Sequence, residues 1–264
     1  MSRLGEVFGR LDRPAFIAYL VAGDPDPGGF MAAARAVIDG GADVLELGMP
    51  FSDPVADGPT IQQAHIRSLE AGMTVDRYFD LAREIRGFSD IPIVLMVYCN
   101  TIYRRGVERF YREAGEAGAD GVLVVDMPPE EGEHALAAAR ANDLDQIFLV
   151  APSTTDERLD LIGGSGGGFL YLASLLGVTG ARDRLSGHAA RLISRVRPCT
   201  RLPIAVGFGI SRPEHARALS EAGANGVIVG SALVKIVEEH SRDPERMAQE
   251  IRKFVAGMRE ALSG

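Results

Sequence analysis

The stretch Gly40-Gly41-Ala42-Asp43-Val44-Leu45-Glu46-Leu47 contains the pattern that decides the fold: a helix end closed by glycine, followed at once by a short apolar run. Glycine suits the end of a helix because it adopts left-handed backbone angles without steric cost. The same pattern returns as AGADGVLVV at residues 117–125 and as AGANGVIVG at residues 222–230. This repetition indicates that one β/α unit is used many times along the chain.

Eight short apolar runs rich in β-branched residues follow one another at fairly even spacing, as expected for parallel strands buried on both faces. They lie at Ala15–Val21, Val44–Leu47, Ile93–Tyr98, Gly121–Val125, Ile147–Val150, Phe169–Leu172, Ile204–Val206 and Gly226–Val229. Amphipathic segments with helical periodicity separate them, for example at residues 30–41, 77–87, 107–118, 130–142 and 213–223. We therefore predict a single α/β domain over residues 1–264, a closed (β/α)₈ TIM barrel, in preference to an open doubly wound sheet, which usually has fewer strands.

The overall charge and the cysteine content exclude several classes of function. A net charge of −8 argues against a surface that binds nucleic acid or anionic membranes. Cys99 and Cys199 are too few for a disulfide framework, and neither belongs to a metal-binding motif. The chain shows no signal-peptide core and no apolar run of the ~18 residues that span a membrane. We therefore expect a cytoplasmic protein that binds no metal.

Glycine-rich segments follow the last three predicted strands, at residues 177–180, 207–211 and 230–234. In barrels of this type the active site lies where the strands end, and phosphate often binds at the last loops. Glycine lets backbone amides approach a ligand, and helices beginning at Ser231 or at Arg212-Pro213 would direct free N–H groups toward an anion. Each glycine alone could simply form a turn, but together they predict a phosphate site.

Two acidic residues are candidates for acid and base catalysis. Glu46 lies within an apolar run, so its side chain should point into the barrel near the upper rim. Burial would raise its pKa and allow it to act as both acid and base, although a hydrogen-bonded structural role stays open. Asp57 follows 57 − 46 = 11 residues later, in a loop that could cover the barrel mouth. Asp53 and Asp57 could instead form turns.

Other polar residues near the strand ends carry weaker signals. Asn100 and Asp126 follow the third and fourth strands, where we expect them to cap helices or orient loops. Tyr171 alternates with leucines and should face inward, into the pocket. The five histidines fall in the intervening helical segments, so they predict neither a catalytic triad nor a metal cluster: His65, His134, His188, His215 and His240.

Residues 45–64, LELGMPFSDPVADGPTIQQA, with YLASLLGVTGAR at 171–182 and AVGFGIS at 205–211, closely resemble the tryptophan synthase α subunit family. The resemblance extends over nearly the whole chain. It implies a retro-aldol cleavage of indole-3-glycerol phosphate into indole and glyceraldehyde 3-phosphate, with neither metal nor organic cofactor. It also implies an α₂β₂ complex with a β subunit, which alone would carry pyridoxal phosphate.

The resemblance also assigns roles to residues. Glu46 would protonate indole C3 and remove the glycerol hydroxyl proton, and Asp57 would stabilise the indole N–H. Tyr171 would lie beside the substrate, and Thr179, on the loop after the sixth strand, would help to hold Asp57 in position. The indole pocket would be lined by Tyr19, Met96, Leu123, Val125, Leu149 and Phe208, and backbone amides would bind phosphate at Gly180, Gly209, Gly230 and Ser231. Residues 50–56, with Pro50 and Asp53, would contact the β subunit. Tyr19, Val125 and Leu175 depart from the residues usual in the family.

Two alternative functions stay open. A related phosphosugar isomerase, or a synthase that forms indole-glycerol phosphate, would usually require a Lys or Cys at a strand end. Lys235, however, lies beyond the eighth strand in a predicted helix. A mainly allosteric subunit that activates a β partner would not need both Glu46 and Asp57, which are intact here.

Overall fold

Eight parallel strands close into a barrel in the computed structural model, which describes residues 2–173, 182–207 and 209–263. Neighbouring strands pair in chain order, and the last strand pairs with the first. Their bounds are β1 Ala15–Val21, β2 Val44–Gly48, β3 Ile93–Val97, β4 Gly121–Val124, β5 Asp145–Val150, β6 Leu170–Ala173, β7 Ile204–Gly207 and β8 Gly226–Val229. The predicted closed barrel is confirmed, and every predicted strand lies within two residues of its expected ends.

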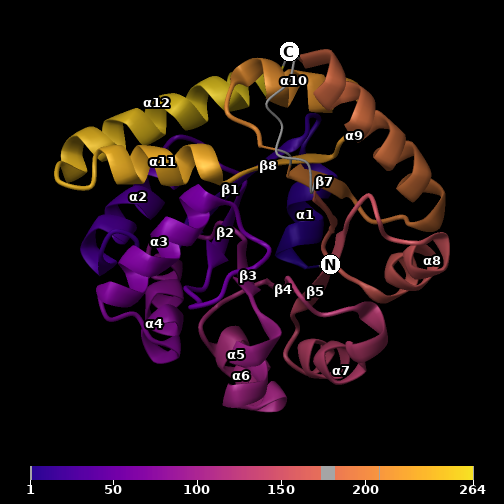
Figure 1. The fold of residues 1–264 in the computed structure, drawn as a ribbon, viewed down its shortest axis with the longest axis horizontal. Coiled ribbons are helices and arrows are strands. Elements are labelled where there is room, and N and C mark those ends of the chain that lie inside the picture. The colour runs from indigo at the N-terminus through magenta and orange to yellow at the C-terminus, as the bar shows by residue number, and fades with distance from the viewer. Residues whose placement is uncertain (1, 174–181, 208, 264) are drawn as a thin grey trace.

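Helices surround this barrel, and α1 appears within the ring of strands in Figure 1 because it covers one end of the barrel. The helices are α1 Arg3–Arg10, α2 Pro27–Asp39, α3 Pro59–Glu70, α4 Val75–Arg86, α5 Cys99–Arg105, α6 Val107–Glu116, α7 Glu133–Ala141, α8 Asp156–Ser165, α9 Arg182–Val196, α10 Pro213–Glu221, α11 Ser231–Glu239 and α12 Pro244–Leu262. Two single turns of 3₁₀ helix occur at Pro129–Glu131 and Arg197–Cys199. Within the described parts of the chain, no helix combines the length and apolar character needed to cross a membrane.

The glycines of the repeated junctions have the conformation that the sequence predicts. Gly41, Gly118 and Gly223 have φ angles of 96°, 81° and 89° and lie shortly before β2, β4 and β8. This left-handed backbone reverses the chain between helix and strand, and any residue with a Cβ would be strained there. The repeats therefore mark true β/α junctions.

Side chains alternate between the two faces of each strand, which creates two separate cores. On β2, Leu45 and Leu47 pack outward among the helices, whereas Val44 belongs to the cluster inside the barrel. Leu4 and Val7 of α1 join this inner cluster and cover the amino-terminal end of the strands. Burial of each such side chain stabilises the fold by about 1.5–3 kcal/mol. With one end of the barrel filled, the carboxyl ends of the strands form the open end.

Candidate active site

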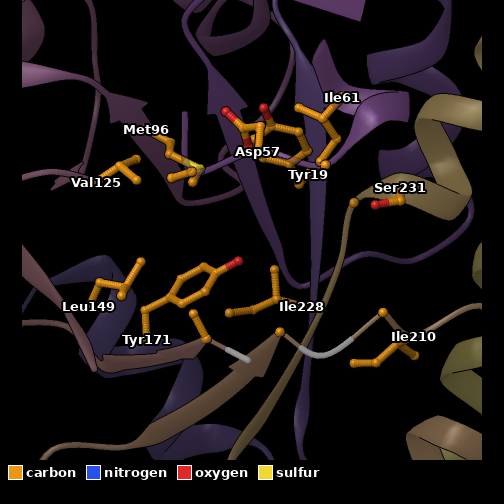
Figure 2. Close-up of a pocket in the computed structure, with 16 residues that line it drawn as sticks. Tyr19, Asp57, Ile61, Met96, Val125, Leu149, Tyr171, Ile210, Ile228 and Ser231 are labelled. Carbon is orange, nitrogen blue, oxygen red and sulfur yellow. The ribbon is translucent and has the colours of Figure 1, made fainter. Parts of the chain in front are cut away.

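A cavity of about 320 Å³ lies at the carboxyl ends of the strands (Figure 2). Most of the predicted site residues line it: Tyr19, Asp57, Met96, Val125, Leu149, Tyr171, Gly209, Gly230 and Ser231. The cavity is also lined by residues that the sequence analysis did not select: Ala56, Gly58, Ile61, Ala173, Gly207, Ile210 and Ile228. Its wall is largely apolar, with Asp57 the charged group at its surface, as in a site that holds a flat apolar ring.

Not every predicted residue lines the cavity. Leu123 is fully buried in the cluster inside the barrel and does not reach the cavity, so its prediction as a pocket residue is not supported. Leu123 lies two residues before Val125 on the chain, and both side chains face the inside of the barrel. Leu123 is farther from the carboxyl end of the strand and therefore does not reach the cavity. Glu46 is also enclosed and does not line the cavity. Thr179, Gly180, Phe208 and Leu175 lie outside the described residues.

Two tyrosines enter the cavity in the same way, each leaning over a glycine of the next strand. Tyr19 of β1 pairs in register with Glu46, and a Cβ on Gly48 would lie 2.2 Å from the Tyr19 hydroxyl. Tyr171 of β6 directs its hydroxyl into the cavity (Figure 2), and a Cβ on Gly207 would lie 2.7 Å from it. The missing side chains at these glycines therefore provide the space that the two rings occupy.

Glu46 is a carboxyl group in an environment that favours its protonated form. Its side chain has no solvent exposure, and both carboxyl oxygens lack a hydrogen-bond partner among the described residues. Burial, and secondarily the negative charge of Asp57, raise the pKa of Glu46 to about 8. Glu46 therefore carries a proton at neutral pH, and the alternative of a hydrogen-bonded structural carboxyl does not fit these contacts.

Glu46 and Tyr19 are neighbours in the barrel wall. They are register partners on β2 and β1, and the Tyr19 ring extends over Gly48, two residues beyond Glu46 on β2. Tyr19 lines the cavity, whereas Glu46 does not. A molecule in this cavity therefore does not contact Glu46 in the conformation described here.

Asp57 is held by residues from two other elements. Its Oδ2 accepts a 2.7 Å hydrogen bond from the Tyr98 hydroxyl, and Nε2 of His65 lies 3.3 Å from the same oxygen. Tyr98 also stacks on Phe51, with ring centroids 4.9 Å apart. Burial and the hydrogen bond to Asp57 raise the pKa of Tyr98, so it stays a donor. The end of the loop that carries Asp57 is thus held against the end of β3 and against α3.

Sequence reasoning missed both Tyr98 and His65. Tyr98 lies two residues after Met96, which lines the cavity, so the alternation of the strand could have placed it on the inner face. His65 lies four residues after Ile61 and shares its face of α3. Within the described residues, no group of His, Cys, Asp and Glu side chains could hold a metal ion.

The opposite side of the cavity presents backbone amides. Gly230 and Ser231 lie where β8 ends and α11 begins, and both line the cavity beside Gly209, whose φ is 51°. The first amides of a helix have no partner within it and carry the positive end of its dipole. Gly209, Gly230 and Ser231, the described part of the predicted phosphate site, thus lie together at the cavity, and phosphate binding there stays a prediction.

The loop after β2 presents only part of the predicted partner surface. Asp53 and Val55 are exposed, whereas Pro50 is buried and cannot contact another chain in this conformation.

After β4, Asp126 accepts a 2.7 Å hydrogen bond from the backbone amide of Cys99 at the start of α5. The expectation that Asp126 caps a helix is confirmed.

Comparisons with known proteins agree with this geometry. The family model described as "Tryptophan synthase alpha chain" matches residues 9–263. A tryptophan synthase alpha chain from Methanoregula boonei is 52% identical over 99% of this chain and 98% of its own length. The structure of Mycobacterium tuberculosis tryptophan synthase has a TM-score of 0.89 and 38% identity, covering 99% of this chain and 98% of that one. A Pyrococcus furiosus tryptophan synthase a2b2 complex has a TM-score of 0.87 and 44% identity, covering 93% and 98%. The chain therefore belongs to the tryptophan synthase alpha chain family.

Proposed function

We propose that this chain cleaves indole-3-glycerol phosphate into indole and glyceraldehyde 3-phosphate, as the lyase subunit of tryptophan synthase. One observation carries the proposal: Glu46 is a fully buried carboxyl group without a hydrogen-bond partner among the described residues, and it is in register with Tyr19, which lines a largely apolar cavity with a second carboxylate, Asp57, at its wall. Burial raises the pKa of Glu46 to about 8. The first can donate and recover a proton near neutral pH, and the second can face a group that becomes positively charged.

The shape of the cavity supports this substrate. Met96, Val125 and Leu149 provide an apolar wall for an indole ring (Figure 2). Across the cavity, the amides at Gly230 and Ser231 would bind the phosphate, supported by the dipole of α11. A molecule with a flat ring at one end and a phosphate at the other matches both walls.

The chemistry follows from the two acids. Protonated Glu46 donates its proton to C3 of indole, and the ring becomes a cation that accepts electrons. Asp57 stabilises the ring N–H as this charge develops. The Glu46 carboxylate then removes the proton of the glycerol hydroxyl next to C3. The C–C bond breaks, its electrons return to the ring, the alkoxide carbon becomes the aldehyde, and Glu46 is again protonated. These steps are proton transfers, so we propose no cofactor for this chain.

A β subunit is the proposed partner. The Pyrococcus furiosus structure above is described as an a2b2 complex, and this chain matches a chain of it over 93% of its own length and 98% of that chain. Asp53 and Val55, which is 76% exposed, offer a surface beside Asp57 for such a partner. Contact there would couple the partner to the catalytic loop. Pyridoxal phosphate is expected only in the partner.

The proposal is tested by incubating the purified chain with indole-3-glycerol phosphate, with and without a tryptophan synthase β subunit, and measuring indole and glyceraldehyde 3-phosphate. We expect both products in equal amounts. Absence of indole even with the β subunit would refute the proposal. Activation of the β subunit without cleavage would identify a purely allosteric subunit, and turnover of other phosphosugars alone would identify an isomerase.

Replacement of Gly48 by alanine should disturb the site without unfolding the barrel. The added Cβ would lie 2.2 Å from the Tyr19 hydroxyl, so the ring must move, with a strain of about 1–3 kcal/mol. We expect kcat/KM for indole-3-glycerol phosphate to fall by about tenfold or more. Gly58→Ala is the control, because Gly58 also lines the cavity but a Cβ there meets nothing within 4 Å. Equal activity of the two variants would contradict this role of Gly48.

A further inference from the structure

Groups from two separate elements meet at one oxygen of Asp57. The Tyr98 hydroxyl and Nε2 of His65 both approach Oδ2, at 2.7 Å and 3.3 Å. Tyr98 directly follows β3, and His65 belongs to α3. Oδ1 of Asp57 makes no hydrogen bond to any residue that the structure describes, and Asp57 lines the cavity (Figure 2). Among the described residues the carboxylate is thus held through Oδ2, and it lies at the wall of the cavity.

The hydrogen bond at the other ring nitrogen determines where His65 carries its proton. The backbone amide of Phe51 donates to Nδ1 at 3.2 Å, so Nδ1 must hold a lone pair. The neutral ring therefore carries its proton on Nε2, the nitrogen that faces Asp57. One histidine thus joins α3 both to the start of the catalytic loop, at Phe51, and to its end, at Asp57.

Nε2 of His65 lies near Oδ2 of Asp57, but the geometry of this contact does not meet that of a hydrogen bond. His65 is 2% exposed, and its Nε2 has no hydrogen-bond partner of good geometry among the described residues, although Oδ2 is only 3.3 Å away. A buried N–H without an acceptor is unfavourable. A small rotation of the carboxylate would complete the bond, and such bonds often tighten only when a ligand is present.

We infer that His65 is a positioning residue for Asp57: its Nε2–H, together with the Tyr98 hydroxyl, orients the carboxylate so that Oδ1 meets the N–H of a ring bound in the cavity. The identity of that ring as indole rests on the proposed function. His65 touches no substrate in this arrangement. It acts by holding one oxygen of Asp57 and the loop that carries it.

Two substitutions separate the two bonds of His65. His65→Asn retains an acceptor near the place of Nδ1 but loses the donor at Nε2. His65→Gln retains a donor near Nε2. With indole-3-glycerol phosphate as substrate, we expect His65→Asn to lower kcat on the order of 10- to 100-fold with KM changed less than about threefold, because misplaced charge acts mainly on the transition state. We expect His65→Gln to stay within about fivefold of the unmodified chain.

Ser68→Ala is the matched control for a merely structural loss on α3. Ser68 is fully buried and donates a 2.6 Å hydrogen bond to the Ala22 carbonyl. We expect this variant to have a lower melting temperature and an unchanged kcat. An unchanged kcat in His65→Asn, or an equal fall in His65→Asn and His65→Gln, would overturn the inference.

A measurement without substrate keeps this test separate from the proposed function. ¹⁵N NMR of the histidine rings reports which nitrogen of His65 is protonated. We expect the Nε2-protonated tautomer, with an Nε2 resonance that shifts in Asp57→Ala and stays in place in Ser68→Ala. A proton on Nδ1, or an Nε2 resonance unmoved in Asp57→Ala, would overturn the role of His65. Failure of the unmodified chain to cleave substrate would instead refute the proposed function.

Discussion

Replacement of Glu46 by glutamine is expected to lower turnover of indole-3-glycerol phosphate by about 10²–10⁴-fold, the usual loss when a general acid or base is removed. The amide has the size of the carboxyl group, but it can neither protonate indole C3 nor accept the hydroxyl proton. Single-turnover measurement of indole release gives the rate directly. Glu70→Gln is the control, because Glu70 is exposed on α3. Turnover of Glu46→Gln within about tenfold of the unmodified chain would exclude Glu46 as the acid and base.

The same substitution should not weaken the fold, and pH provides the check. The pKa of Glu46 is raised from 4.5 in its ordinary state to about 8 in the folded chain. Between these pH values the folded protein holds a proton that the unfolded chain has lost, so the free energy of unfolding falls as pH rises and levels off above pH 8. Glu46→Gln has no carboxyl group to titrate at this position. Its free energy of unfolding, relative to that of the unmodified chain, should therefore rise between pH 4.5 and 8 by an amount on the order of a few kcal/mol. Urea unfolding at several pH values measures it.

Replacement of Asp57 by asparagine is the second large effect. The neutral amide cannot stabilise positive charge on the indole ring, so kcat should fall by about 10²–10³-fold. The negative charge of Asp57 also contributes to the raised pKa of Glu46. Asp57→Asn should therefore lower the pKa of Glu46 and shift the pH profile of the remaining activity toward lower pH.

Asp53→Asn is the matched control for this loop. Asp53 lies four residues earlier and is exposed, and no hydrogen bond or ion pair of its side chain is found among the described residues. The isolated Asp53→Asn chain should keep its kcat and its pH profile. A comparable loss in both variants would indicate that the loop tolerates no change of charge, and the specific role of Asp57 would then be wrong.

The sequence was sufficient to predict the barrel because its signals are local. Strands buried on both faces are short apolar runs, and several helix-to-strand junctions carry a left-handed glycine, as at Gly41 and Gly223. Glu46 could be predicted by the same logic, because a charge inside such a run has no place in an ordinary core. The direction of its pKa shift could be predicted from burial, which is the larger cause, whereas the contribution of Asp57 depends on the fold.

The surroundings of Asp57 could not be predicted in this way. Tyr98 and His65 come from β3 and α3, and they meet Asp57 only when the packed barrel brings those elements together. Periodicity also gives the face of a residue but not its height along the barrel. Leu123 is therefore predicted in the pocket together with Val125, although of these two residues Val125 lines the cavity and Leu123 does not. Ile228 lines the cavity but is not among the predicted residues, because its height along the barrel also cannot be derived from periodicity.

The protonation of Glu46 at neutral pH is tested most directly by ¹³C NMR of the chain labelled at the glutamate carboxyl carbons. Comparison with Glu46→Gln assigns the resonance of Glu46. We expect this resonance to titrate with a midpoint near 8, because burial raises the pKa of Glu46 to about 8. A midpoint near the ordinary value of 4.5 would show that Glu46 is ionised at neutral pH and cannot act as the acid proposed here.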